Sequence, residues 1–409
     1  MNILFVADVS ISTVIGGAER VLYEQSTRLV RRGYDVHIMT RYLPGHQGFQ
    51  EQINGVKEWR YEIDQNSAAS YLKSTRQNSR MLFESLQRRH QFDVIVFQQP
   101  FSAQGIARSP LGRNIRKLYV CHSLSFEEFI SRNYKPERLK ERFFYELNVF
   151  LRRCLEKRVL KDSDKIIALS RYTIDKLDPA YGIPSRKYAI IPGGVDLDRF
   201  RPLVNKAEVK KKLGLPEKDI VLFTVRNLVF RMGLENLIEA VSIVHREFPG
   251  ICLVIGGSGP LRKELEVRSE ALGVQDLIRF EGFIPEEALP DYYGMADLFI
   301  LPTRELEGFG LVTLEAMASG VPVLGTPVGG TLEILGRFDQ GFLFKDTTPG
   351  AIAGLIREKC GLIRQDPEAW LELSQKCRRF VEETYSWEKH VDRLETFFSP
   401  IEARTKERQ

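Results

Sequence analysis

The sequence has few of the residues that build disulfide frameworks or zinc sites. Only five of 409 residues are cysteines, and no two of them form a C-x-x-C pair. They are Cys121, Cys154, Cys252, Cys360 and Cys377. An odd, scattered set of cysteines is typical of buried thiols in a reducing compartment. A disulfide framework and a cysteine zinc site are therefore excluded, and we expect no metal site.

Long apolar runs are also missing. The opening run, residues 3–7, stops at Asp8, well short of a signal-peptide core. No stretch approaches the roughly 20 apolar residues that span a bilayer. Positive charge is in only slight excess, with 59 Lys and Arg against 54 Asp and Glu. This excess is too small to indicate nucleic-acid binding. We therefore expect a cytoplasmic protein that binds no nucleic acid.

What the sequence does contain is a series of short apolar runs that alternate with helical patterns. This alternation predicts α/β domains with parallel sheets and helices on both faces. The first series of runs is 3–7, 36–39, 94–97, 118–120 and 165–169, and the second is 222–225, 252–255, 278–280, 298–301 and 322–324. A Gly- and Pro-rich segment, 190–196, separates the two series.

We therefore predict two doubly wound domains, residues 1–192 and 193–385. A last helical pattern starts with Ser386 as its N-cap and carries apolar residues at helical spacing. We expect this segment, 386–409, to pack back on the first domain, although its pattern alone does not show that.

The strongest local signal is residues 304–311, which follow the predicted strand 298–301 and lead into a helix. Gly308 and Gly310 let a backbone approach a ligand closely, and the start of a helix offers unpaired N–H groups to an anion. Glu307 and Glu315 would repel a phosphate, but they suit hydroxyls such as those of a ribose and a sugar. The alternative is that both acids are ordinary solvated residues beside a simple turn, and the residues alone leave the two interpretations about equal.

Five segments together resemble the retaining glycosyltransferases of family 4. The stretch from Glu307 to Val323 is similar to that family's motif of two glutamates separated by seven residues. The other four segments, in the family's order, are 16–20, 191–196, 256–260, and Gly329-Gly330 followed by Glu333. The resemblance implies a GT-B fold, in which two Rossmann-like domains face a central cleft. It also implies transfer with retention of configuration and without a catalytic metal or other cofactor.

The resemblance assigns roles to individual residues. Glu315 matches the carboxylate that holds the nucleotide ribose, and Glu307 matches the one near the transferred sugar. The donor-binding residues it implies are Gly16, Gly17, Gly308, Phe309, Gly310 and Leu311. His122 follows the predicted strand 118–120, where the family often has a histidine that contacts the sugar or its glycosidic oxygen. A neutral imidazole can donate or accept such a hydrogen bond, although a lone histidine at a strand end is more often structural.

One segment departs from the family pattern. The family usually has an arginine and, five residues later, a lysine that neutralise the donor diphosphate. Here these positions hold Asn227 and Met232, which carry no charge. Arg226 and Arg231 stand one position earlier in each case, and guanidinium groups suit bidentate phosphate contact. We therefore predict that Arg226 and Arg231 bind the donor.

Two basic stretches in the first domain bear on the acceptor. Lys73, Arg76 and Arg80 have helical spacing, and residues 131–162 contain ten Lys or Arg against five Asp or Glu, interleaved with aromatic residues. Such a pattern suits an anionic membrane surface or a lipid-diphosphate acceptor, which would place the protein at the inner membrane face. The alternative, which the pattern favours somewhat more, is a solvated helix face that covers an aromatic core.

The sequence thus predicts a retaining, metal-independent hexosyltransferase. It would move a sugar from a nucleotide diphosphate to the hydroxyl of a sugar or lipid-linked acceptor, in the synthesis of a cell-surface polysaccharide or glycolipid. A binder of nucleotide sugars without turnover is the alternative, because Asn227 and Met232 are uncharged. A dinucleotide-dependent dehydrogenase is excluded, because the first loop lacks G-x-G-x-x-G and Met39-Thr40-Arg41 supplies no ribose-binding acid.

Overall fold

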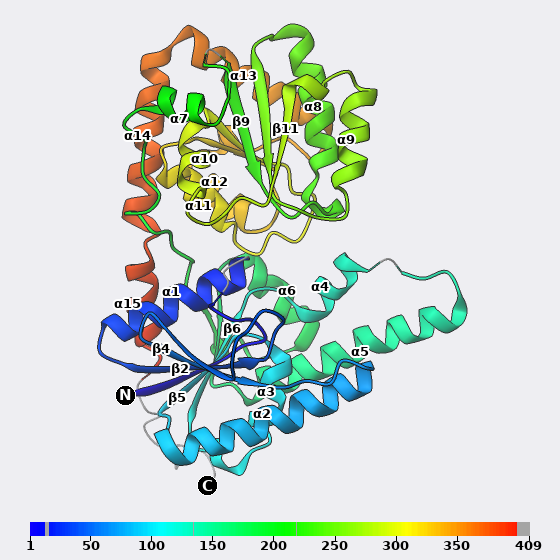
Figure 1. Ribbon diagram of the computed structural model, residues 1–409, viewed down its shortest axis with the longest axis vertical. Coiled ribbons are helices and arrows are strands. Elements are labelled where there is room, and N and C mark those ends of the chain that lie inside the picture. Colours follow the sequence, from blue (N-terminus) through cyan, green and yellow to red (C-terminus); the bar gives the residue numbers. More distant parts are fainter. Residues whose placement is uncertain (13–15, 134, 218, 399–409) are drawn as a thin grey trace. The chain divides into compact units, whose positions relative to one another are not determined.

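The chain divides into two compact units. The computed structural model describes residues 1–12, 16–133, 135–217 and 219–398 (Figure 1). The first unit comprises residues 1–192 and the segment that starts at Trp387, and the second comprises Gly193–Ser386. The unit boundary thus falls at the Gly- and Pro-rich segment.

The first unit is built on an eight-stranded sheet in the order β3-β4-β2-β1-β5-β6-β7-β8. All neighbouring strands are parallel except β3 and β4. The strands are β1 (Asn2–Val6), β2 (Asp35–Arg41), β3 (Gln50–Ile53), β4 (Val56–Tyr61), β5 (Val94–Phe97), β6 (Arg116–Cys121), β7 (Lys165–Ala168) and β8 (Tyr188–Ile190). Residues 3–6 of β1 are fully buried, as expected for a central parallel strand covered on both faces.

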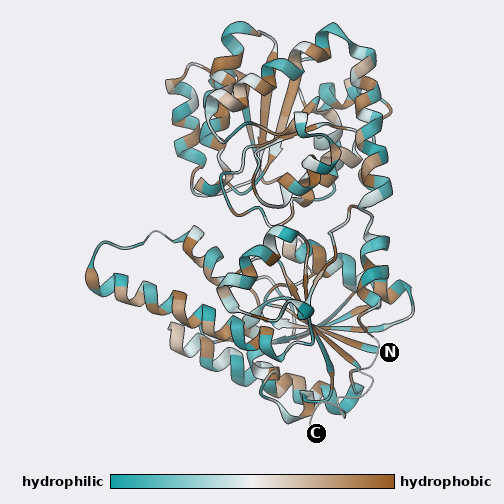
Figure 2. Cartoon of the chain, turned by 180° about the vertical axis from the view of Figure 1, so that it is seen from behind, coloured by the Kyte–Doolittle hydropathy of each residue, from teal (hydrophilic) through white to brown (hydrophobic). Residues whose placement is uncertain are grey.

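Seven helices complete the described part of the first unit. They are α1 (Gly17–Arg31), α2 (Ala68–His90), α3 (Pro100–Ile106), α4 (Ser125–Arg132), α5 (Leu139–Asp162), α6 (Arg171–Tyr181) and α15 (Trp387–Glu395). Colouring by hydropathy shows the strands as mainly apolar and the helices as mixed (Figure 2). Among the residues that the structure describes, every helix is too short or too polar to cross a bilayer.

The second unit has a five-stranded parallel sheet in the order β11-β10-β9-β12-β13. Its strands are β9 (Ile220–Val225), β10 (Ile251–Gly256), β11 (Ile278–Gly282), β12 (Leu298–Leu301) and β13 (Val323–Gly325). Its helices are α7 (Lys206–Lys212), α8 (Leu234–Glu247), α9 (Arg262–Ala271), α10 (Leu289–Met295), α11 (Leu311–Ala318), α12 (Gly329–Phe338), α13 (Pro349–Gln365) and α14 (Pro367–Thr384).

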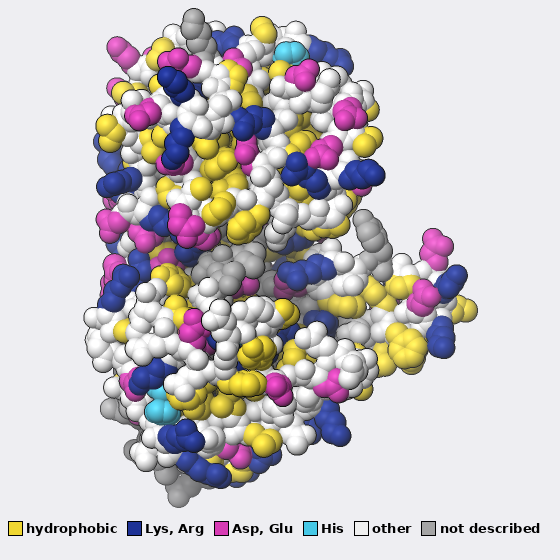
Figure 3. All heavy atoms as spheres, viewed as in Figure 1, with side chains coloured by type: hydrophobic (Ala, Val, Ile, Leu, Met, Phe, Trp, Pro, Cys, Tyr) yellow, Lys and Arg dark blue, Asp and Glu magenta, His cyan; other side chains and the backbone are white. Residues whose placement is uncertain are grey.

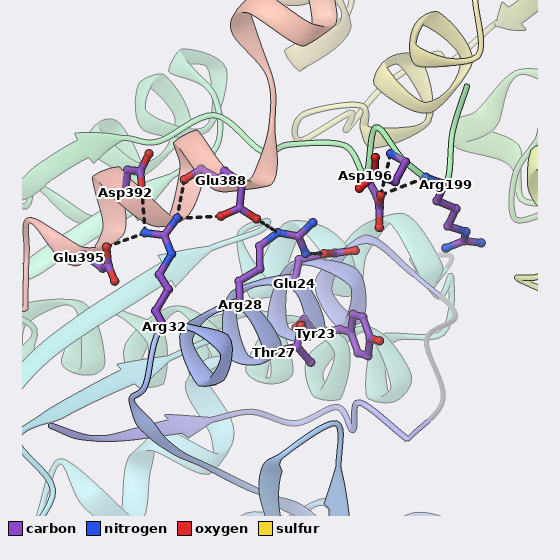
Figure 4. A network of polar contacts seen from close by, with 11 residues as sticks. Tyr23, Glu24, Thr27, Arg28, Arg32, Asp196, Arg199, Glu388, Asp392 and Glu395 are labelled. Atoms are coloured by element: carbon purple, nitrogen blue, oxygen red, sulfur yellow. Dashed lines mark hydrogen bonds and ion pairs between the residues drawn. The ribbon is translucent and has the colours of Figure 1, made fainter. Parts of the chain in front are cut away.

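Helix α15 returns to the first unit and is fixed to α1 by ion pairs (Figure 4). Arg28 Nε lies 2.9 Å from a Glu388 carboxylate oxygen, and Arg32 contacts Glu388, Asp392 and Glu395 at 2.6–2.8 Å. The apolar face of α15 is buried, with Trp387 2% exposed. The buried residues of α15 recur at the helical spacing that the sequence shows after Ser386.

Strands β3 and β4 were not predicted, and the reason is their polarity. β4 reads Val-Lys-Glu-Trp-Arg-Tyr, so it has no apolar run. The structure nevertheless buries Glu58 completely, because Arg60 Nη2 lies 2.7 Å from its carboxylate and Ser10 donates a hydrogen bond to it. An internal ion pair of this kind satisfies both charges inside the sheet, and a pattern based on hydropathy does not detect it.

Candidate functional site

In the second unit, the predicted residues gather at the carboxyl ends of β9 and β12. These neighbouring strands mark the point where the strand order reverses, the usual ligand position in open parallel sheets. Arg226 directly follows β9, and Glu307 lies in the loop between β12 and α11. Residues that are 81 positions apart in sequence are thereby brought into contact.

Arg226 is the central cation of this cluster. Its side chain is only 5% exposed, and its Nη2 lies 2.5 Å from Glu307 Oε2 and 3.0 Å from Met232 Sδ. The other terminal nitrogen, Nη1, is buried and has no hydrogen-bond partner among the residues that the structure describes. A buried guanidinium N–H without an acceptor is unfavourable, so this nitrogen is suited to an anionic ligand.

Arg231 approaches the same loop from the 3₁₀ turn Phe230–Met232. Its Nη1 donates a hydrogen bond to the carbonyl of Leu306 at 3.1 Å, and its own carbonyl accepts one from the Arg304 N–H at 2.8 Å. Leu306 has a φ of 59°, which is rare for a residue with a side chain. Such a conformation costs about 1–3 kcal/mol and persists where the surroundings impose it, often at functional sites.

Two glycines at the start of α12 let the Glu307 loop lie directly on that helix. The Gly330 N–H donates a hydrogen bond to the Glu307 carbonyl at 2.8 Å. A Cβ atom at Gly329 would lie 1.9 Å from that carbonyl oxygen, and one at Gly330 would lie 2.4 Å from the Phe309 backbone. The Gly329-Gly330 pair is therefore required for the close approach of two backbones.

The starts of α11 and α12 add further donors to this site. Gly310 is the N-cap residue of α11, with a φ of 92° and no side-chain cap. The hydroxyls of Thr313 and Thr331 are buried without a hydrogen-bond partner among the described residues. Both would lie 3.2–3.3 Å from a Cβ atom at Gly310. Free N–H groups at a helix start, beside hydroxyls and Arg226, form a site suited to a phosphate.

Glu315 is held on α11 by a tyrosine that the sequence analysis missed. The Tyr293 hydroxyl donates a hydrogen bond to Glu315 Oε2 at 2.7 Å. Burial and the charge of Glu315 raise the pKa of Tyr293 well above its usual range, so it stays a donor. The Tyr293 ring packs among Phe200, Phe223 and Phe299. This packing fixes the position of the Glu315 carboxylate.

In the first unit, Gly16 and Gly17 start α1, and His122 follows β6. The Glu19 carboxylate accepts hydrogen bonds from the Gly16 and Glu19 N–H groups, and burial raises its pKa. His122 Nε2 lies 2.7 Å from Gln98 Oε1. Burial, with a smaller effect from the charge of His390, lowers the pKa of His122 to about 4. The imidazole is therefore neutral near pH 7, as the predicted role requires.

The sequence matches two models of known protein families, one for each unit of the chain. Residues 15–199 match the model "Glycosyltransferase Family 4", and residues 205–387 match the model "Glycosyl transferases group 1". The chain belongs to glycosyltransferase family 4.

Curated relatives of this family-4 chain cover about half of it or more. A GDP-mannose-dependent alpha-(1-6)-phosphatidylinositol monomannoside mannosyltransferase of Mycolicibacterium smegmatis is 32% identical over 59% of this chain and 64% of its own length. A D-inositol 3-phosphate glycosyltransferase of Streptomyces avermitilis is 29% identical over 57% of this chain and 51% of its own. The matched part thus spans less than two thirds of either relative.

Solved structures match the family-4 chain over nearly its whole length. A sucrose-phosphate synthase from Thermosynechococcus elongatus has a TM-score of 0.78 and 22% identity, covering 97% of this chain and 98% of that one. The Anabaena protein HepE, in complex with UDP and glucose, has a TM-score of 0.73 and 18% identity over 97% and 98%. These likenesses confirm the predicted GT-B fold.

The predicted site residues of this family-4 chain form two groups. Arg226, Arg231, Glu307 and Glu315 lie with the 308–311 loop in the second unit, whereas Gly16, Gly17 and His122 belong to the first. Asn227 is exposed, whereas Met232 is 5% exposed and its sulfur packs against the Arg226 guanidinium. The uncharged residue at position 232 therefore lines the Arg226 guanidinium through Nη2, and Nη1 has no hydrogen-bond partner in the described part of the chain.

Proposed function

We propose that this protein is a retaining, metal-independent glycosyltransferase. It would transfer a sugar from a nucleotide diphosphate to an acceptor hydroxyl. The observation that carries the proposal is the buried Arg226 guanidinium: one nitrogen contacts Glu307, and the other has no acceptor among the described residues. A donor diphosphate bound at the start of α11 would supply that acceptor. Cation and helix start together would stabilise the charge that develops on the departing phosphate.

The remaining residues fit distinct parts of such a donor. Glu315, held by Tyr293, would accept hydrogen bonds from the ribose hydroxyls. Glu307 would contact the transferred sugar, and its pairing with Arg226 limits its repulsion of the diphosphate. The acceptor hydroxyl would attack from the leaving-group face, and a phosphate oxygen would take its proton. Because a nucleotide diphosphate is a good leaving group, this route needs neither a strong general acid nor a bound cation.

The relatives suggest which donor to test first. The Mycolicibacterium relative is named as GDP-mannose-dependent and acts on a phosphatidylinositol mannoside. We therefore propose GDP-mannose as the first donor candidate, and a lipid-linked or polysaccharide acceptor in glycolipid or cell-surface polysaccharide synthesis. A binder of nucleotide sugars without turnover stays the alternative, because Asn227 and Met232 replace the charged residues usual in the family.

A thermal-shift screen with UDP, GDP, ADP, TDP and their sugar conjugates tests the donor site. We expect one nucleotide series to raise the melting temperature. Glu315→Ala should weaken binding of that series by about ten- to a hundred-fold, because hydrogen bonds to a charged group contribute about 1.5–3 kcal/mol. Glu358→Ala, on the exposed face of α13, is the matched control and should bind normally. No shift with any nucleotide, or equal binding by Glu315→Ala, would contradict the assignment.

We further propose that the start of α5 binds an anionic membrane. This segment, residues 139–151, is called the α5 arm below; it projects from the first unit (Figure 1). Its exposed apolar side chains are Leu139 (85%), Phe143 (64%), Phe144 (55%), Leu147 (38%), Phe150 (61%) and Leu151 (38%). Figure 3 shows hydrophobic side chains gathered there with basic ones between them.

The aromatic residues of the α5 arm do not form a covered core, because only Tyr145 among them is buried. Lys140 and Arg142 are exposed and make no ion pair with other described residues. Apolar side chains that enter a bilayer beside cations that meet its headgroups are typical of interfacial helices. Other basic residues of the stretch have internal roles: Arg152 stacks on Phe101 and Phe129 at 4.7–5.0 Å.

Flotation with liposomes tests the α5 arm. The protein should co-float with vesicles that contain phosphatidylglycerol and much less with pure phosphatidylcholine. Phe143→Ser with Phe144→Ser should abolish flotation, because two large apolar side chains are lost from the contact. Leu371→Ser, which removes a side chain 60% exposed on α14, should float like the wild type. Flotation that is absent, or unaffected by the paired serines, would remove the membrane proposal, and light scattering would show whether the arm joins two copies instead.

A further inference from the structure

A continuous chain of hydrogen bonds runs through the core of the first unit and ends at His122. Its Nε2 lies 2.7 Å from Gln98 Oε1, and Gln98 Nε2 donates to Gln25 Oε1 at 2.8 Å. Gln25 Nε2 lies 2.8 Å from His390 Nε2, and His390 Nδ1 lies 2.7 Å from the carbonyl oxygen of Pro192. The four side chains come from four segments: α1, the ends of β5 and β6, and α15.

The Pro192 carbonyl fixes the direction of every bond in this chain. A carbonyl only accepts, so His390 Nδ1 must carry a proton and donate it. A neutral imidazole has one N–H, and His390 Nε2 is then an acceptor. Gln25 must turn its NH₂ group to His390 and its oxygen to Gln98. For the same reason Gln98 turns its oxygen to His122, whose Nε2 must donate.

The surroundings hold these groups in place and keep both rings neutral. Gln25, Gln98 and His390 are at most 2% exposed. The ion pairs of Arg28 and Arg32 with Glu388 hold α15 against α1 (Figure 4). This packing brings His390 to Gln25. Burial lowers the pKa of His390 to about 4, as it does for His122. The two histidines of this hydrogen-bond chain therefore carry their protons on different ring nitrogens, Nδ1 in His390 and Nε2 in His122.

We propose that Gln98, Gln25 and His390 are positioning residues that hold His122 in the Nε2–H tautomer, leaving Nδ1 as a hydrogen-bond acceptor. Given the proposed function, His122 accepts a hydrogen bond from a hydroxyl of the transferred sugar. It does not donate one to the glycosidic oxygen. The sequence left these two roles open, and the carbonyl of Pro192 decides between them. Among the described residues, His122 Nδ1 makes no hydrogen bond.

Long-range ¹H–¹⁵N NMR of the free protein tests the tautomers directly. At pH 7 the His122 spectrum should show a protonated Nε2 and an unprotonated Nδ1, and His390 should show the reverse. The signals are assigned by their loss in His122→Gln and His390→Gln among the six histidines. A His122 ring protonated on Nδ1, or on both nitrogens, would overturn the proposal. Failure of the proposed function would leave these spectra unchanged, because no substrate is present.

Two variants separate positioning from packing. In Gln98→Leu the His122 ring loses its acceptor, so the spectrum should become that of a mixture, and kcat for transfer should fall about ten-fold or more. An unchanged tautomer in Gln98→Leu would overturn the proposal. Gln98→Glu should keep the Nε2–H tautomer of His122, because a carboxylate accepts. An ionised carboxylate at position 98 would also turn the Gln25 amide and require a second proton on His390, whereas a protonated one would donate to Gln25 and leave His390 unchanged. If Gln98→Leu does not fold, a His122 that loses its Nε2–H tautomer in Gln98→Glu would overturn the proposal.

Discussion

Replacing Arg226 with alanine should lower kcat/KM for the sugar donor by about a hundred- to a thousand-fold, the usual loss when a pre-organised donor to a developing negative charge is removed. The change has a second effect, because Glu307 then becomes a partly buried carboxylate without its cation. Breaking a buried pair by removing one partner is strongly destabilising, by about 3–5 kcal/mol. Steady-state kinetics and thermal denaturation measure the two effects separately.

Two further variants isolate the contribution of the Arg226 guanidinium. Arg226→Met with Glu307→Gln removes the charges together, so stability should recover and transfer should not. Arg268→Ala is the matched control, because it breaks a surface pair with Glu239 that has a similar N–O distance, 2.7 Å, in the same unit. It should retain the wild-type rate. Wild-type kcat/KM in a folded Arg226→Ala protein would contradict the phosphate role of Arg226.

Replacing Gly329 with alanine should displace the Glu307 loop and abolish most transfer. The new Cβ atom would lie 1.9 Å from the Glu307 carbonyl oxygen, and the residue would have to keep a φ of 60°. Overlap with backbone cannot be relieved by turning a side chain, so the loop must move. A misplacement of about 1 Å near a reacting centre costs about a hundred-fold in rate. The measurement is kcat/KM, with the melting temperature of the same sample.

Gly336→Ala is the control for this prediction, since it makes the same substitution in the same helix, α12. Apart from the chain neighbours and the helix's own backbone, no atom of the described residues would lie within 4 Å of a Cβ at Gly336. An alanine there should raise the stability of the helix by about 0.5–1 kcal/mol, because glycine loses more conformational freedom on folding. Transfer should be unchanged. Equal rates for the two variants would show that the contact between Gly329 and Glu307 does not position the loop.

The sequence predicted the fold and the main residues of the second-unit cluster because both follow from local patterns. Apolar runs such as residues 3–6 predict buried strands by themselves, and the glycines beside Glu307 predict a local turn. The contact of Arg226 with Glu307 was not predicted, because the two residues are 81 positions apart in the sequence. Their positions at the ends of adjacent strands were the available signal.

Tyr293, Thr313 and Thr331 were missed for a different reason. Their residue types are common, and their importance comes from burial and from unmet hydrogen bonds, which only the folded backbone defines. The hydrogen-bond chain of Gln25, Gln98 and His390 was missed for a similar reason. It joins side chains from separate elements, and its direction depends on one backbone carbonyl, at Pro192.

The most direct test of the proposed function is ¹H NMR of donor turnover. The protein is incubated with the nucleotide sugar that binds in the thermal-shift screen, in the presence of excess EDTA and without added acceptor. We expect slow hydrolysis in which the first free sugar has the anomeric configuration of the donor, at a rate that EDTA does not change. Tight donor binding without hydrolysis, and without transfer when an acceptor is added, would support the alternative of a non-catalytic binder. A first product of inverted configuration, or loss of turnover with EDTA, would contradict a retaining, metal-independent transferase.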